Sequence, residues 1–221
     1  FEAEEGGNVT ISALESIGIP DYQENGLCVY NVDWDLGDGR NQVFYNGEAL
    51  AEARHPNSHT SRRYYPQQLD LSPLWPTQGN IQVTLSGTAD TATSTTDLNQ
   101  PDNYWVGGTL VTLHGRGYGV ATAKITASES SKLYLGKKST RLWHTVGGDD
   151  SDSHFDFAYI TNTKNAIDVP GEWFWGDGKL YIKPPKGKNA RTLNLEAKKR
   201  QITVDLADNE YIHLVGINTI G

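Results

Sequence analysis

The chain of 221 residues lacks methionine altogether and contains a single cysteine, Cys28. One cysteine excludes a disulfide within the chain and a zinc site built from cysteines, so we expect Cys28 to be a small core residue. No apolar run reaches the roughly eighteen residues that a membrane-spanning helix needs, and we therefore expect no membrane partner. Position 1 is Phe and no basic-then-apolar leader follows it, which predicts a mature or excised piece of a longer chain.

Positive charge is also scarce, with 19 Lys and Arg against 27 Asp and Glu and a net charge of −8. Phosphate binding needs a concentrated positive field, so this composition argues against a nucleic-acid partner. The one basic run, Lys198-Lys199-Arg200, is short and is expected to be a solvated strand end.

Helical periodicity is rare. The best candidate is "NGEALAEARHP", in which Leu50, Ala51 and Ala53 predict about two helical turns before Pro56. Short stretches with alternating apolar side chains, each closed by Gly, Asn or Ser, occur elsewhere and predict strands. These stretches are "NVTIS", "NQVFYNGE", "NIQVTLSG" and "GGTLVTLHG". The fold class predicted from this pattern is all-β.

Two further segments have a distinct composition. Residues 86–103, "SGTADTATSTTDLNQPDN", contain almost no large apolar side chain and predict a loop or a weak edge segment. Near the carboxyl end, alternating apolar pairs begin about ten residues apart, as in a solenoid of stacked β-rungs. The pairs are Leu193 with Leu195, Ile202 with Val204, and Ile212 with Leu214.

The most aromatic stretch is "GEWFWGDGKLYIKPPKG", residues 171–187. Its Gly176-Asp177-Gly178 segment predicts a three-residue β-hairpin connection. Alternation along the strand places Trp173 and Trp175 on one face and Phe174 on the other. The two indoles are either the wall of a core or a platform on which a sugar ring stacks, and the sequence leaves both interpretations open.

Two glycine-rich corners combine aromatic rings with polar side chains, "DNYWVGG" and "LHGRGYG". A sugar presents flat C–H faces ringed by hydroxyls, so its binding site needs both kinds of side chain. The alternative is that these rings are anchors that close loops. Including the hairpin, the candidate carbohydrate-binding residues are Tyr104, Trp105, His114, Arg116, Tyr118, Trp173 and Trp175.

Acidic side chains are concentrated in "GGDDSDSHFDF", and such a density of oxygen ligands suits calcium. The candidate ligands are Asp149, Asp150, Asp152 and Asp156. The glycine and terminal glutamate of an EF-hand loop are missing, and a metal-free acidic loop is the alternative. A second, weaker candidate is the cluster of Asp33, Asp35 and Asp38.

Catalytic residues cannot be assigned from spacing. Glycoside hydrolysis needs two carboxylates about 5 to 10 Å apart, and separate strands can supply them in many combinations. A lyase needs a base and a group that neutralises a uronate, for which Arg54, His55 and the Lys198-Lys199-Arg200 run are candidates by chemistry. Neither G-x-S-x-G nor H-E-x-x-H occurs, which disfavours a serine hydrolase and a zinc protease.

Several phrases together resemble secreted bacterial right-handed parallel β-helix proteins that act on polysaccharides as glycoside hydrolases or polysaccharide lyases. They are "VDWDLGDGRNQVFYNGEALAEARHPN", "DLNQPDNYWVGGTLV", "GEWFWGDGKLYIKPPKG" and "LEAKKRQITVDLADNEYIHLVGINTIG". The resemblance implies opening β-helix strands in residues 1–57, an inserted antiparallel β-sandwich or barrel-like domain in 58–190, and a return to the rungs in 191–221. It also implies that the catalytic groove follows Gly221, so that the chain is an amino-terminal portion.

The function expected from these observations is carbohydrate recognition or scaffolding within a secreted or periplasmic polysaccharide-degrading protein. Its partners would be a polysaccharide and the remainder of a longer β-helix chain. The alternative functions are a free-standing, non-catalytic carbohydrate-binding module and a structural insertion that touches no sugar.

Overall fold

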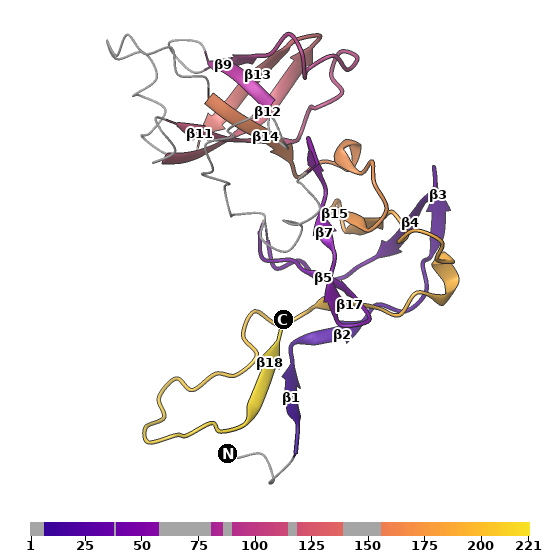
Figure 1. The fold of residues 1–221 in the computed structure, drawn as a ribbon, viewed down its shortest axis with the longest axis vertical. Helices are drawn as coiled ribbons and strands as arrows, with labels where there is room; N and C mark the ends of the chain where they lie inside the picture. Colours follow the sequence, from indigo (N-terminus) through magenta and orange to yellow (C-terminus); the bar gives the residue numbers. More distant parts are fainter. Residues whose placement is uncertain (1–6, 38, 58–80, 86–89, 115–118, 139–155) are drawn as a thin grey trace.

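The computed structural model describes residues 7–37, 39–57, 81–85, 90–114, 119–138 and 156–221. Within these residues the chain is built of strands, with two short 3-10 helices, η3 (Lys164–Ala166) and η4 (Ala190–Thr192). The predicted all-β class is therefore confirmed. A closed sheet lies at one end of the molecule, smaller sheets lie in the middle, and a pair of strands lies at the other end (Figure 1). None of the helices in the described ranges is long and apolar enough to cross a membrane.

The largest sheet is an antiparallel barrel. Its strands follow the order β11-β12-β13-β10-β9-β14, and β14 also pairs with β11, which closes the ring. Strand β8 extends the ring by pairing with β14. Closure leaves the ring without a free strand edge. The strands are β8 (Arg54–His55), β9 (Ile81–Leu85), β10 (Thr91–Thr93), β11 (Thr109–His114), β12 (Gly119–Glu129), β13 (Lys132–Lys138) and β14 (Asp156–Thr161).

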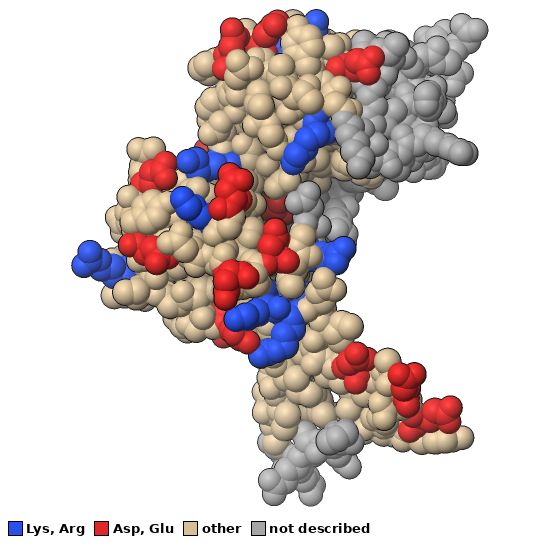
Figure 2. Space-filling view, turned by 180° about the vertical axis from the view of Figure 1, so that it is seen from behind, with Lys and Arg blue, Asp and Glu red and all other residues tan. Residues whose placement is uncertain are grey.

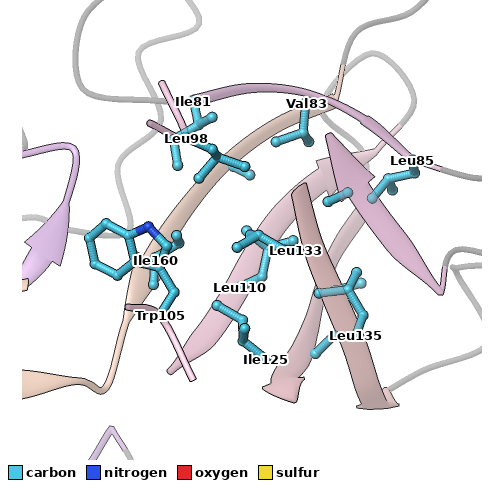
Figure 3. Close-up of a cluster of buried hydrophobic side chains, with 14 of the residues drawn as sticks. Ile81, Val83, Leu85, Leu98, Trp105, Leu110, Ile125, Leu133, Leu135 and Ile160 are labelled. Carbon is cyan, nitrogen blue, oxygen red and sulfur yellow. The ribbon is translucent and has the colours of Figure 1, made fainter. Parts of the chain in front are cut away.

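The interior of the barrel is filled by the alternating side chains of these strands (Figure 3). On β9 the predicted residues Ile81, Val83 and Leu85 are all buried. Leu110 of β11 and Ile160 of β14 are fully buried in the same cluster. The strands predicted from alternation in "NIQVTLSG" and "GGTLVTLHG" are confirmed.

The prediction of a loop or weak edge for residues 86–103 is wrong for its central part. Strand β10 lies inside the barrel sheet, between β13 and β9. Ala92 is fully buried and Leu98, farther along, is also buried. Small side chains suit this position because the interior of a closed barrel is narrow, and the composition therefore concealed a core strand.

Two sheets occupy the middle of the molecule and share a second core. The five-stranded sheet contains, in order, β3 (Tyr22–Glu24), β4 (Leu27–Asn31), β16 (Lys179–Ile182), β15 (Glu172–Gly176) and β7 (Ala51–Glu52). The four-stranded sheet contains β2 (Leu14–Ser16), β17 (Leu195–Lys198), β5 (Val43–Tyr45) and β6 (Glu48–Ala49). The β15–β16 hairpin falls within the segment 58–190, yet it pairs with the early strands β4 and β7 and not with the barrel.

The predicted helix over "NGEALAEARHP" is wrong, because this stretch forms β6, β7 and β8. Asn46 and Gly47 both have positive φ angles, 51° and 79°, and they join the paired residues Tyr45 and Glu48. Two successive positive φ angles make a tight hairpin turn that sends the chain back as a strand. Strand β7 then pairs with β15, and this pairing holds the backbone in an extended conformation where the periodicity predicted a helix.

The β15–β16 hairpin is present as predicted, but its loop is shorter. Gly176 pairs with Lys179, so only Asp177 and Gly178 lie in the turn, with φ angles of 55° and 68°. Gly176 is the last residue of the strand. A Cβ on Gly176 would lie 2.5 Å from the Phe174 ring, so any larger residue at this position would have to displace that ring.

The two ends of the described chain pair in parallel. Strand β1 (Val9–Ser12) runs beside β18 (Ile217–Ile220), with Val9 opposite Ile217 and Ser12 opposite Ile220 (Figure 1). The ten-residue rhythm predicted for 191–221 is not seen. Residues 202–204 and 212–214 form no strand, and β17 pairs antiparallel with β2 and β5. The described residues thus contain two parallel pairs, β1 with β18 and β7 with β15, and no stacked series of rungs.

Candidate functional site

The corner at Tyr104 and Trp105 is fastened to the barrel. The Trp105 side chain is only 3% exposed, and its Nε1 donates to Gln100 Oε1 at 2.9 Å. The backbone N–H of Trp105 donates to Ser128 Oγ at 3.1 Å. Tyr104 is half-buried, and its hydroxyl donates to the carbonyl oxygen of Asn165 at 3.1 Å. This geometry matches the anchor interpretation, and a sugar-binding role for the two rings stays a prediction.

His55 lies against the same corner. Its ring stacks on Trp105 with centroids 4.9 Å apart and an interplanar angle of 30°. His55 Nε2 is 3.4 Å from the carbonyl oxygen of Asp97. The imidazole is therefore held between a buried indole and the backbone.

Arg54, the neighbouring candidate base, packs between strands. Its guanidinium carbon lies 3.9 Å from the centroid of the Tyr159 ring, and its Nε donates to the carbonyl oxygen of Pro56 at 3.0 Å. Burial lowers the pKa of Arg54, against the opposing effects of Tyr159 and the buried Glu172. The same environment raises the pKa of the Tyr159 hydroxyl through burial, partly offset by Arg54.

Trp173 and Trp175 share one face of β15, as the alternation predicts, and that face is the second core. Their side chains are 5% and 8% exposed. Trp173 Nε1 donates to the carbonyl oxygen of Leu50 at 3.0 Å, and Trp175 meets Trp34 edge-on at 5.3 Å between ring centroids. The indoles thus form a core wall in this structure. On the opposite face, Phe174 stacks with Tyr181 at 6.1 Å.

Much of the second glycine-rich corner lies outside the described residues. Arg116 and Tyr118 are among these, and His114 is described only as the end of β11. Asp149, Asp150 and Asp152 are outside as well, and Asp156 is described only as the start of β14. The corner and the calcium site therefore stay predictions.

The described residues contain no group of three or more His, Cys, Asp and Glu side chains arranged to hold a metal ion. In the weaker candidate cluster, Asp35 Oδ1 accepts hydrogen bonds from the backbone of Gly37 and from Asn41 Nδ2, both at 2.7 Å. Asp33 is exposed, and Asp38 lies outside the described residues. The Asp35 carboxylate is thus engaged in shaping a turn.

The basic run at the end of β17 pairs with one carboxylate. Arg200 lies 2.6 Å and Lys199 3.5 Å from the two oxygens of Glu15, and the Lys199 ammonium is 5.1 Å from the Trp34 ring centroid. These contacts match the expected exposed strand end. Over the coloured part of the face in Figure 2, positive and negative side chains are interspersed.

A pocket that sequence reasoning missed lies in the middle of the molecule. Its volume is about 450 Å³, and it is bordered by the β5–β6 hairpin, by Pro170 and Gly171 before β15, and by Pro185 and Lys186 after β16. Three distant segments contribute to it, so no single stretch of sequence signals it. The prolines of "KPPKG" and the turn in "YNGE" were the available hints.

Comparison with known proteins gives one fold likeness. No protein-family model matches the chain, and no curated protein matches it. A solved structure described as "Glycoside hydrolase" superposes with a TM-score of 0.55 at 17% sequence identity over 86% of this chain. This chain spans 32% of the length of that protein. At this identity the likeness shows a shared fold.

Proposed function

We propose that this chain is the amino-terminal portion of a secreted polysaccharide-degrading protein. In this proposal it begins a right-handed parallel β-helix, carries an inserted β-barrel, and contributes carbohydrate recognition or a scaffold. The full catalytic groove would lie in further coils of the longer protein. The partners are a polysaccharide and those coils.

The observation that carries the proposal is the parallel pairing of β1 with β18. These strands are almost the whole chain apart, and every Cα pair from Val9–Ile217 to Ser12–Ile220 is in register. A β-helix grows by adding such parallel neighbours, each coil burying its side chains against the next. The segment of chain between these two strands forms the barrel and the middle sheets.

Exposed apolar side chains near β18 support the same proposal. Ile202 is 58% exposed, and Leu214 and Val215 are also exposed. Further coils stacked beside β18 would cover such side chains and remove their apolar surface from water. The fold shared with a much longer glycoside hydrolase also supports a carbohydrate ligand.

A free-standing carbohydrate-binding module is the second candidate. The closed sheet and its own buried cluster favour it, because together they make a unit with a core of its own. In both candidates the corner with His114, Arg116 and Tyr118 belongs to the proposed sugar-binding surface. Calcium held by Asp149, Asp150, Asp152 and Asp156 is likewise proposed.

A panel of polysaccharides tests these alternatives. We expect the chain to be retarded in native gels that contain its polysaccharide, without release of reducing ends or of unsaturated uronates. Product formation would show that this chain has its own catalytic residues. It would overturn the proposal that the catalytic groove lies in further coils of the longer protein. Absence of both retardation and product would contradict carbohydrate recognition.

A further inference from the structure

The pocket beside the β5–β6 hairpin has walls that the surrounding structure fixes. The Leu50 N–H donates to the carbonyl oxygen of Val43 at 2.8 Å, and the Leu50 carbonyl accepts from Trp173 Nε1. Elsewhere in the lining, the Gly171 N–H donates to the carbonyl oxygen of Lys183 at 2.8 Å. Pro170 and Pro185 restrict the backbone further. Fixed walls reduce the entropy lost when a ligand binds.

Tyr45 supplies an aromatic surface to this pocket. It is half-buried and packs against the second core, which holds its ring in place. Tyr45 and Glu48 are Cα partners across the hairpin, so their side chains project to the same face of the sheet. An aromatic ring beside a hydrogen-bonding group is the combination that a sugar ring requires.

Two charged side chains line the same pocket, Glu48 and Lys186, and both are exposed. Among the described residues, neither the Glu48 carboxylate nor the Lys186 ammonium makes an ion pair or a side-chain hydrogen bond. The carboxylate can accept hydrogen bonds from hydroxyls, and the ammonium can donate to hydroxyl or ring oxygens. Since the two charges balance, the pocket has no net positive charge to attract a uronate or a sulfate, and a neutral ligand fits it better.

We infer that this pocket binds one pyranose ring of a neutral polysaccharide, with Tyr45 under the ring, Glu48 accepting from hydroxyls and Lys186 donating to oxygens. The pocket volume of about 450 Å³ lies in the range of small-molecule sites and accommodates a single ring with part of its neighbours. The inference rests on the proposed function, because that function supplies the polysaccharide. It assigns the recognition to residues outside both glycine-rich corners.

The test uses the whole chain with xylan and galactomannan as neutral probes and polygalacturonate as the uronate probe. Dissociation constants are measured by affinity electrophoresis for the wild type and for Tyr45→Ala, Glu48→Gln and Lys186→Ala. Matched controls are Glu210→Gln and Lys124→Ala, which change exposed residues that do not line the pocket. Glu48→Gln and Lys186→Ala alter exposed side chains, so they report on binding even if Tyr45→Ala reduces stability.

We expect a neutral probe to bind the wild type and both controls equally, and to bind Glu48→Gln and Lys186→Ala about tenfold more weakly. Equal binding by the wild type and these two variants would overturn the pocket assignment and leave the proposed function intact. Binding of polygalacturonate alone, weakened by Lys186→Ala and strengthened by Glu48→Gln, would overturn the neutral ligand. Absence of wild-type binding to any of the polysaccharides would overturn carbohydrate recognition by this chain together with the pocket.

Discussion

The guanidinium of Arg54 lies over the ring of Tyr159, with its central carbon 3.9 Å from the ring centroid. The two residues come from β8 and β14, which pair through Arg54 and Thr161. The sequence suggested Arg54 as a base by chemistry alone. Its burial and its bond to Pro56 indicate instead that it joins the edge strand β8 to the barrel.

We predict that Arg54→Met lowers the free energy of unfolding by about 2 to 3 kcal/mol. The variant loses the cation–π contact with Tyr159 and the positive charge that compensates the buried carboxylate of Glu172. Urea unfolding followed by tryptophan fluorescence measures this change. The control Arg191→Met alters an exposed arginine and should change stability by less than about 0.5 kcal/mol. Unchanged stability of Arg54→Met would show that Arg54 does not join the strands.

Trp105 is predicted to be a stability residue of the barrel. Trp105→Ala should cost about 3 to 5 kcal/mol, since a buried indole and its stacking on His55 are removed. Tyr104→Phe is the matched change in the same corner. It removes only the hydroxyl bond to Asn165 and should cost about 1 kcal/mol or less. Thermal unfolding of the two variants checks the contrast, and a cost below about 1 kcal/mol for Trp105→Ala would contradict the core assignment.

Tyr30 carries a buried hydroxyl with no hydrogen-bond partner in the described residues. Burial raises the pKa of this hydroxyl above its ordinary value of 10.0, and Cys28 adds to the rise. The folded protein therefore keeps the Tyr30 proton at a pH where the unfolded chain releases it. This hydroxyl therefore gives the free energy of unfolding no pH dependence below about pH 10, and it lowers that free energy as the pH rises further.

We predict two results for Tyr30→Phe. At neutral pH the variant should be more stable by about 1 kcal/mol, because an unsatisfied polar group is removed from the core. Above pH 10 its stability should fall less steeply than that of the wild type, by up to about 1.4 kcal/mol per pH unit. Urea unfolding at several pH values gives both numbers. A loss of stability at neutral pH together with parallel alkaline slopes would show that the hydroxyl has a partner.

The sequence predicted those strands whose side chains alternate strongly. Ile81, Val83 and Leu85 specify β9 because each is large, apolar and directed inward. Strand β10 was missed because Ala92 and its threonine neighbours resemble a loop in composition, although the small side chain of Ala92 suits the barrel interior. The stretch 48–55 was misassigned because the Asn46-Gly47 turn and pairing with β15 outweigh its helical periodicity.

The site was less predictable than the strands. An aromatic residue in a glycine-rich segment has the same local sequence whether its ring points inward or outward, and only the contacts of Trp105 with Ser128 and Gln100 decide. The pocket joins Tyr45, Pro170 and Lys186, which the chain separates widely. Such a site is created by the pairing of β5, β15 and β16 with their neighbours. The spacing of residues along the chain does not predict these pairings.

Strands β1 and β18 pair in parallel, as the neighbouring coils of a β-helix do. Disulfide cross-linking of cysteine pairs in a Cys28→Ala background tests this pairing directly. We expect Val9→Cys with Ile217→Cys and Ser12→Cys with Ile220→Cys both to cross-link under mild oxidation, because these residues are Cα partners. If Val9→Cys cross-links instead with Ile220→Cys, and Ser12→Cys with Ile217→Cys, the two strands are antiparallel and do not begin a β-helix.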